Sequence, residues 1–206
     1  MSIETWLAFV LATSILLIIP GPTIMLVVSY ALSHGRSSGW ATVPGVALGD
    51  FIAITASLAG AGALMAASTT LFSVVKLLGA AYLIWLGIRL WRSEPEIQEL
   101  PQTRYNASRR AMFRNAWIVT ALNPKGMVFF VAFVPQFVNA DAPLLLQFCI
   151  LVITFVTLAA INVALWAILA GQVRQQINQP SRLRWLNRAG ASFMIGAGLV
   201  TATFRQ

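Results

Sequence analysis

The sequence predicts an all-α membrane protein, a single integral membrane domain in which six transmembrane helices form a 3+3 inverted repeat. Composition is the first reason. The chain of 206 residues is 58% hydrophobic and 10% charged, whereas a soluble domain is about 25% charged because its surface faces water. The mean hydropathy is +0.78. Long apolar runs are the second reason, and matching interruptions in the two halves are the third.

Each apolar run is long enough to cross a bilayer, which takes about 20 residues of helix. Backbone groups in lipid need internal partners, so these runs form helices, and the alternating polarity of a β-barrel strand is absent. The predicted helices cover residues 5–33, 40–66, 72–91, 112–136, 142–173 and 187–204.

Prolines interrupt the first and the fourth predicted helices, through Pro20-Gly21-Pro22 and Asn123-Pro124-Lys125. A proline lacks the N–H that the helix needs and displaces a carbonyl one turn back, so we expect both helices to be broken there. The sequence leaves open whether the two helices span the membrane or re-enter on the same side.

The repeat is visible in the third helix of each half. Gly79-Ala80-Ala81-Tyr82-Leu83-Ile84-Trp85-Leu86-Gly87 matches Gly190-Ala191-Ser192-Phe193-Met194-Ile195-Gly196-Ala197-Gly198 at both end glycines, an alanine and an isoleucine. We therefore expect residues 1–91 to form the first three-helix repeat and residues 111–206 the second. A polar cytoplasmic linker, residues 92–110, joins them. An odd number of helices per half gives the halves opposite orientations.

Basic residues are distributed unequally between the two predicted membrane faces. The net charge is +8, and the connections after the first, third and fifth helices hold most of it. Those connections carry Arg36, Arg89, Arg92, Arg104, Arg109, Arg110, Arg114, Arg174, Arg182, Arg184 and Arg188, and the other face carries Lys76 and Arg205. The basic face is cytoplasmic by the positive-inside rule, so both termini are expected outside. This distribution disfavours a nucleic-acid partner.

The helix breaks and three polar residues form the predicted binding site. Broken segments at corresponding places in two halves indicate a transporter's substrate site, and a half-helix that begins after Pro22 would offer its N–H groups to an anion. Asp50 lies deep in the second helix, where an ionisable group indicates function. It follows a small-xxx-small spacing, Gly45 to Gly49, that lets another helix approach closely.

Lys125 and Asn162 complete the candidate residues. Lys125 is deep in the fourth helix beside the break and is expected to neutralise Asp50 or to hold a substrate carboxylate; a lysine that reaches the membrane surface is the alternative. Asn162 is a mid-span polar group of the fifth helix, and an asparagine that only joins helices is equally compatible with the sequence.

Several chemistries lack the residues that they need. The single histidine, His34, and the single cysteine, Cys149, do not form a metal-ligand cluster, and neither a phosphate-binding loop nor a hydrolase motif is present. We expect no cofactor, no metal and no enzymatic activity.

The motifs together resemble the LysE/RhtB family of amino-acid exporters. The resemblance rests on Pro20-Gly21-Pro22, Gly49-Asp50, the Gly79 to Gly87 segment, Leu122-Asn123-Pro124-Lys125 and Pro135-Gln136-Phe137, and it extends over essentially the whole chain. It implies a multi-pass protein of the bacterial inner membrane that extrudes amino acids such as lysine, threonine, homoserine or its lactone, or leucine.

The leading hypothesis is a proton-driven carrier for a small amino acid or derivative. The two breaks and Lys125 would bind the carboxylate, and Asp50 the ammonium or a coupling proton. An inorganic cation carrier or channel with Asp50 as ligand is the alternative, and a membrane-embedded enzyme or assembly factor ranks below both. The expected partners are this small molecule and membrane lipid; the sequence leaves a homodimer open.

Overall fold

The computed structural model describes residues 1–93, 107–139, 142–177 and 180–203. Those residues form helices, with no strand among them. The elements are α1 (Ile3–Ile18), α2 (Pro22–His34), η1 (Arg36–Ser38), α3 (Gly39–Ala67), α4 (Thr69–Arg92), α5 (Arg109–Ala121), α6 (Pro124–Val128), η2 (Phe129–Phe133), η3 (Val134–Phe137), α7 (Leu144–Ile177) and α8 (Pro180–Thr203).

Both predicted breaks are present, and both arise from a proline that forces the preceding residue out of the helix. Proline forces the residue before it away from helical geometry. Ile19, before Pro20, is extended, and so is Asn123, before Pro124. The bend is 56° between α1 and α2 and 40° between α5 and the segment that begins with α6. Pro22 and Pro124 then occupy the first turn of the next helix, where the missing N–H costs nothing.

Within the described residues, α3, α4 and α7 are each long and apolar enough to cross a membrane. The two bent pairs raise the number of candidate spans to five if each pair is one span. The chain is therefore a multi-pass membrane protein. The predicted sixth span, residues 187–204, falls on α8 as far as Thr203. Helix α8 is not among the described helices that are long and apolar enough to cross a membrane, so the count of six stays a prediction.

Several helix ends differ from the predicted spans, and the start of α4 at Thr69 instead of residue 72 is one of them. Three others have a clear local cause. Helix α8 begins at Pro180 instead of residue 187, because proline is favoured at a first helical position. Helix α7 continues to Ile177, since straight-chain polar residues extend a helix beyond its apolar part. Helix α5 begins at Arg109, inside the predicted linker, where the Ser108 hydroxyl caps it by accepting from Ala111 N at 3.3 Å. The rest of the linker, residues 94–106, lies outside the described residues.

The fourth predicted helix is more irregular than its sequence suggested. After α6 the backbone forms a π turn, η2, and then a 3-10 turn, η3. Pro135 lies at the start of η3 and cannot donate to a carbonyl one turn back, so the helix widens before it and tightens around it. The Gln136 side chain donates to the Ala132 carbonyl at 3.3 Å and to the Thr201 hydroxyl of α8 at 2.6 Å.

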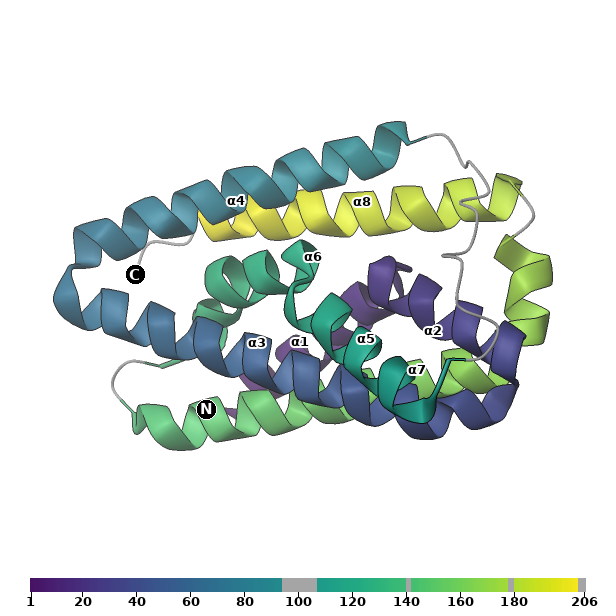
Figure 1. The fold of residues 1–206 in the computed structure, drawn as a ribbon. Coiled ribbons are helices and arrows are strands. Elements are labelled where there is room, and N and C mark those ends of the chain that lie inside the picture. Colours follow the sequence, from purple (N-terminus) through teal and green to yellow (C-terminus); the bar gives the residue numbers. More distant parts are fainter. Residues whose placement is uncertain (94–106, 140–141, 178–179, 204–206) are drawn as a thin grey trace.

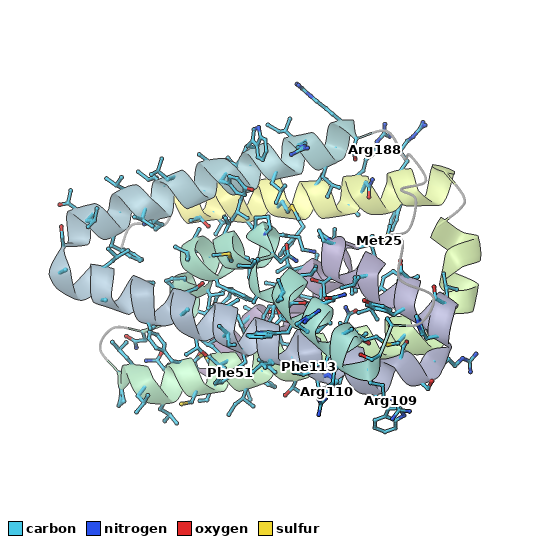
Figure 2. All side chains as sticks on the ribbon, viewed as in Figure 1. Met25, Phe51, Arg109, Arg110, Phe113 and Arg188 are labelled. Carbon is cyan, nitrogen blue, oxygen red and sulfur yellow. The ribbon has the colours of Figure 1, made fainter. Side chains whose placement is uncertain are left out.

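Successive segments run back and forth along one axis (Figure 1). Helix α4 runs from left to right in that view and α8 runs beside it from right to left; α3 and α7 also run in opposite directions. Arg109, Arg110 and Arg188 all lie in the right-hand half of the molecule (Figure 2).

Glycines allow the closest helix contacts. A Cβ on Gly49 of α3 would lie 2.8 Å from the Trp117 carbonyl of α5, and one on Gly45 2.5 Å from the Phe113 carbonyl. The predicted close approach at this spacing is therefore confirmed.

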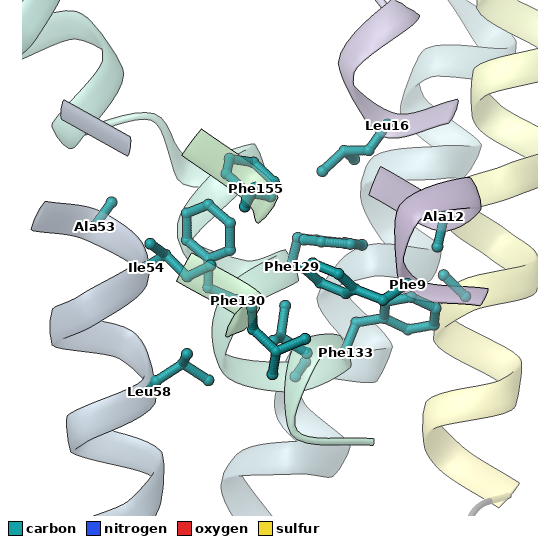
Figure 3. Close-up of a cluster of buried hydrophobic side chains, with 14 of the residues drawn as sticks. Phe9, Ala12, Leu16, Ala53, Ile54, Leu58, Phe129, Phe130, Phe133 and Phe155 are labelled. Atoms are coloured by element: carbon teal, nitrogen blue, oxygen red, sulfur yellow. The ribbon is translucent and has the colours of Figure 1, made fainter. Parts of the chain in front are cut away.

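Aromatic side chains fill the centre of the molecule. The π turn places Phe129, Phe130 and Phe133 against α1, α3 and α7 (Figure 3). Phe130 meets Phe155 of α7 edge to face, with ring centroids 4.6 Å apart, a favoured arrangement of aromatic pairs. This cluster lies directly beside the α1 break, because Leu16 and Ile19 belong to it.

Candidate functional site

A narrow cavity of about 40 Å³ lies between the two helix breaks. Five of the eight predicted site residues line it: Gly21, Asp50, Asn123, Lys125 and Asn162. The three prolines, Pro20, Pro22 and Pro124, are not part of its lining. They contribute by ending one half-helix and starting the next. A cavity of this size holds water but not an amino acid, so the structure is a closed conformation.

The first half of the site is the carboxyl end of α1. The last carbonyls of a helix have no partner within the helix. Here the Lys125 ammonium donates to the carbonyls of Leu16, at 3.2 Å, and Ile19, at 2.9 Å. The Asn162 side-chain amide donates to the Leu17 carbonyl at 3.1 Å. Side chains from α6 and α7 thus supply the hydrogen-bond donors that the last carbonyls of α1 lack.

The second half is the amino end of α2 and its contacts with the other break. The N-cap residue, Gly21, offers no side chain to the first N–H groups of α2, which form the positive end of the helix dipole. The Thr23 hydroxyl accepts from the Thr120 hydroxyl at 3.3 Å and from the Asn123 side-chain amide at 3.4 Å. These bonds join the first break to the second.

Asn123 also shapes the second break itself. Its side-chain oxygen accepts from the backbone N–H of Lys125 at 3.1 Å, as an N-cap asparagine does. Position 123 thereby caps α6 and orients the start of the helix that carries Lys125.

Asp50 is 9% exposed and shares the cavity with Lys125. Among the described residues it accepts no hydrogen bond, and Lys125 is not within the 4.0 Å of an ion pair. Lys125 therefore does not touch Asp50 in this conformation, and its role in neutralising Asp50 or in holding a substrate carboxylate stays a prediction. The two charges face one space and are separated by it. A buried carboxylate without a hydrogen bond is costly, so the site favours a cation or a proton at Asp50.

Sequence reasoning missed Thr23 and Thr120, which are both buried. Their signal was present, because each is a hydroxyl residue within three positions of a break inside an apolar run. A threonine can also satisfy its hydroxyl within its own helix in lipid, and so the sequence does not separate a site threonine from an ordinary one.

Comparison with known proteins identifies the relatives of this chain. The model of the family described as LysE type translocator matches residues 14–204. An uncharacterized membrane protein of Vibrio cholerae is 34% identical over 98% of both chains. The homoserine/homoserine lactone efflux protein of Salmonella typhi is 33% identical over the full length of both. The leucine efflux protein of Klebsiella pneumoniae is 27% identical over 66% of this chain and 65% of that protein. No solved structure matches significantly.

Proposed function

Because this chain belongs to the family of LysE type translocators, we propose that it exports a small amino acid or a close derivative. We place it in the bacterial inner membrane and expect the proton gradient to drive it. Relatives named for efflux of homoserine, its lactone and leucine support this substrate class. A secondary carrier of this kind needs no nucleotide, in agreement with the missing phosphate-binding loop.

The observation that carries the proposal is the pair of helix ends at the first break. The carboxyl end of α1 is the negative end of a helix dipole, and the amino end of α2 is a positive end. Both ends reach one cavity together with Asp50 and Lys125. An amino acid has one ammonium and one carboxylate, and two opposite helix ends match these two groups. An inorganic cation would offer no negative group to the amino end of α2 or to Lys125.

In this proposal each group of the substrate has a defined place. The ammonium lies between Asp50 and the carbonyls that end α1. The carboxylate lies at the N–H groups of α2, beside Gly21, and near Lys125. Asp50 is also the group in the cavity that can take up a proton during the return step, which would couple transport to the gradient.

Alternating access would follow from an inverted repeat of residues 1–91 and 111–206, with both termini outside the cytoplasm. The opposite directions of α4 and α8 and of α3 and α7 support this arrangement (Figure 1). In carriers built this way the two halves rock about a central site. The closed cavity then has to open toward one side before a substrate enters.

A flux measurement separates the amino-acid carrier from the cation carrier or channel. Purified protein in proteoliposomes should transport homoserine, homoserine lactone or leucine when a proton gradient is imposed, and collapse of that gradient should stop net transport. Monovalent and divalent metal ions should not move in the same vesicles. Metal-ion flux without any amino-acid flux would overturn the proposal, and empty liposomes provide the background.

A further inference from the structure

The carboxyl end of α1 is already occupied by an ammonium group, that of Lys125. Its Nζ reaches carbonyls 109 and 106 residues earlier in the chain, at Leu16 and Ile19. A lysine ammonium has three donors and no acceptor, and two of its donors are used here. The Asn162 amide already serves the carbonyl between them, at Leu17. The end of α1 is therefore shaped to receive one primary ammonium.

The charges around this position favour a cation. The carbonyls lie at the negative end of the α1 dipole, and Asp50 lines the same cavity without touching Lys125. The site can hold a compact –NH₃⁺ but offers little to a bulky cation without N–H groups, since the carbonyls need donors. These are also the properties that an amino-acid ammonium requires.

We infer that the end of α1 is a binding site for a primary ammonium, which Lys125 fills in this structure and which the substrate ammonium takes over. This inference rests on the proposed function and adds that Lys125 competes with the substrate ammonium for the same carbonyls. Two ammonium groups do not share one pair of carbonyls, because like charges at contact repel strongly. Lys125 therefore leaves as the substrate enters, and its freed ammonium can turn to the substrate carboxylate.

Displacement of Lys125 would also loosen the molecule at a defined place. Lys125 belongs to the second broken helix, and its two bonds hold the end of the first. When the substrate replaces these bonds, the two broken helices lose this link between them. Substrate binding would in this way release the closed conformation, and departure of the substrate would restore it.

Chemical rescue tests the ammonium site without any transport measurement. Lys125→Ala removes three methylenes and the ammonium, and n-propylammonium replaces them. We expect this variant to melt below the wild type in detergent. Propylammonium at ten times its Kd should raise the melting temperature by about 3–5 °C. 1-Propanol, which has no charge, and propyltrimethylammonium, which has no N–H donors, should give no comparable gain.

Lys76→Ala is the matched control, because it truncates the same side chain in α4, outside the cavity. Its melting temperature should not respond to propylammonium. Equal responses of the two alanine variants, or equal effects of propylammonium and propyltrimethylammonium on Lys125→Ala, would overturn the inference. Neither outcome bears on whether the wild-type protein exports amino acids, so the proposed function would stand even if this inference failed.

Lys125→Met provides a second, independent readout in a variant that keeps the side-chain length. With the internal competitor removed, a carboxylate-free substrate such as homoserine lactone should bind about ten-fold more tightly than in the wild type, measured by calorimetry. The affinity for homoserine itself should increase less, because its carboxylate no longer has the Lys125 ammonium as a partner. Lactone binding that is unchanged or weaker would contradict the competition between Lys125 and the substrate.

Discussion

The contact between α4 and α8 is symmetric, whereas the two helix breaks are not. In α4 a Cβ on Gly87 would lie 2.9 Å from the Ala191 carbonyl of α8. In α8 a Cβ on Gly198 would lie 2.8 Å from the Ala80 carbonyl of α4. Gly87 matches Gly198 and Ala80 matches Ala191 in the aligned sequence segments, so the two contacts pair the same matched positions.

The breaks share their proline geometry but differ in their polar groups. The second break carries Asn123 and Lys125, whose side chains cap α6 and complete α1. The first break offers only Gly21 between its prolines. The proposed repeat would thus keep its symmetry where small residues suffice for packing. It would lose symmetry at the breaks, where the proposed substrate has two different ends.

Removal of the Asp50 charge should have the largest effect on function. Asp50→Asn keeps the shape of the side chain but cannot hold a proton or attract the ammonium. Proton-driven efflux in everted vesicles should fall by about a hundred-fold, equivalent to about 2.7 kcal/mol. Glu4→Gln, which neutralises an exposed carboxylate at the start of α1, should retain efflux. Wild-type efflux in well-expressed Asp50→Asn would assign the charge a structural role.

Alanine at either symmetric glycine should cost stability, and by the same amount. Gly87→Ala and Gly198→Ala each place a methyl against a backbone carbonyl, which costs about 2 kcal/mol. The two values should agree within about 0.5 kcal/mol if the contacts are equivalent. Gly196→Ala is the control, because nothing lies within 4 Å of its added Cβ. Thermal unfolding in detergent measures all three, and clearly unequal costs at positions 87 and 198 would break the symmetry argument.

Two buried threonines give the smallest expected difference. Thr23→Val deprives Thr120 and Asn123 of an acceptor and should lower stability by about 1 kcal/mol. Thr13 is 0% exposed, and its hydroxyl has no partner among the described residues. Thr13→Val should therefore be neutral or slightly stabilising, because it removes an unsatisfied hydroxyl. The same unfolding measurement compares the two variants. An equal loss of stability in both would mean that the hydrogen bonds of Thr23 do not stabilise the site.

Local rules in the sequence were enough to predict the breaks. Proline acts on its own neighbour, so Ile19 and Asn123 could be placed outside the helices without knowledge of the fold. Gly45 and Gly49 predicted a close helix contact for the same reason, since spacing alone defines a smooth helix face.

The partners of Lys125 could not be predicted from the sequence. They are carbonyls more than a hundred residues away, and every residue has a carbonyl, so no residue type marks them. The π turn at Phe129–Phe133 was missed because its cause, Pro135, was assigned to the end of a helix. The partners of Lys125 depend on how distant segments meet, whereas the π turn follows from a local proline.

The size of the closed cavity, about 40 Å³, determines what a measured affinity would mean. If only the open fraction of molecules binds, the apparent Kd equals the intrinsic Kd divided by that fraction. Every substrate bears the same factor, so the ratio of two substrates' affinities reports contacts alone, while the absolute values also contain the opening equilibrium. A substitution that only favours the open conformation would strengthen binding of all substrates equally and leave selectivity unchanged.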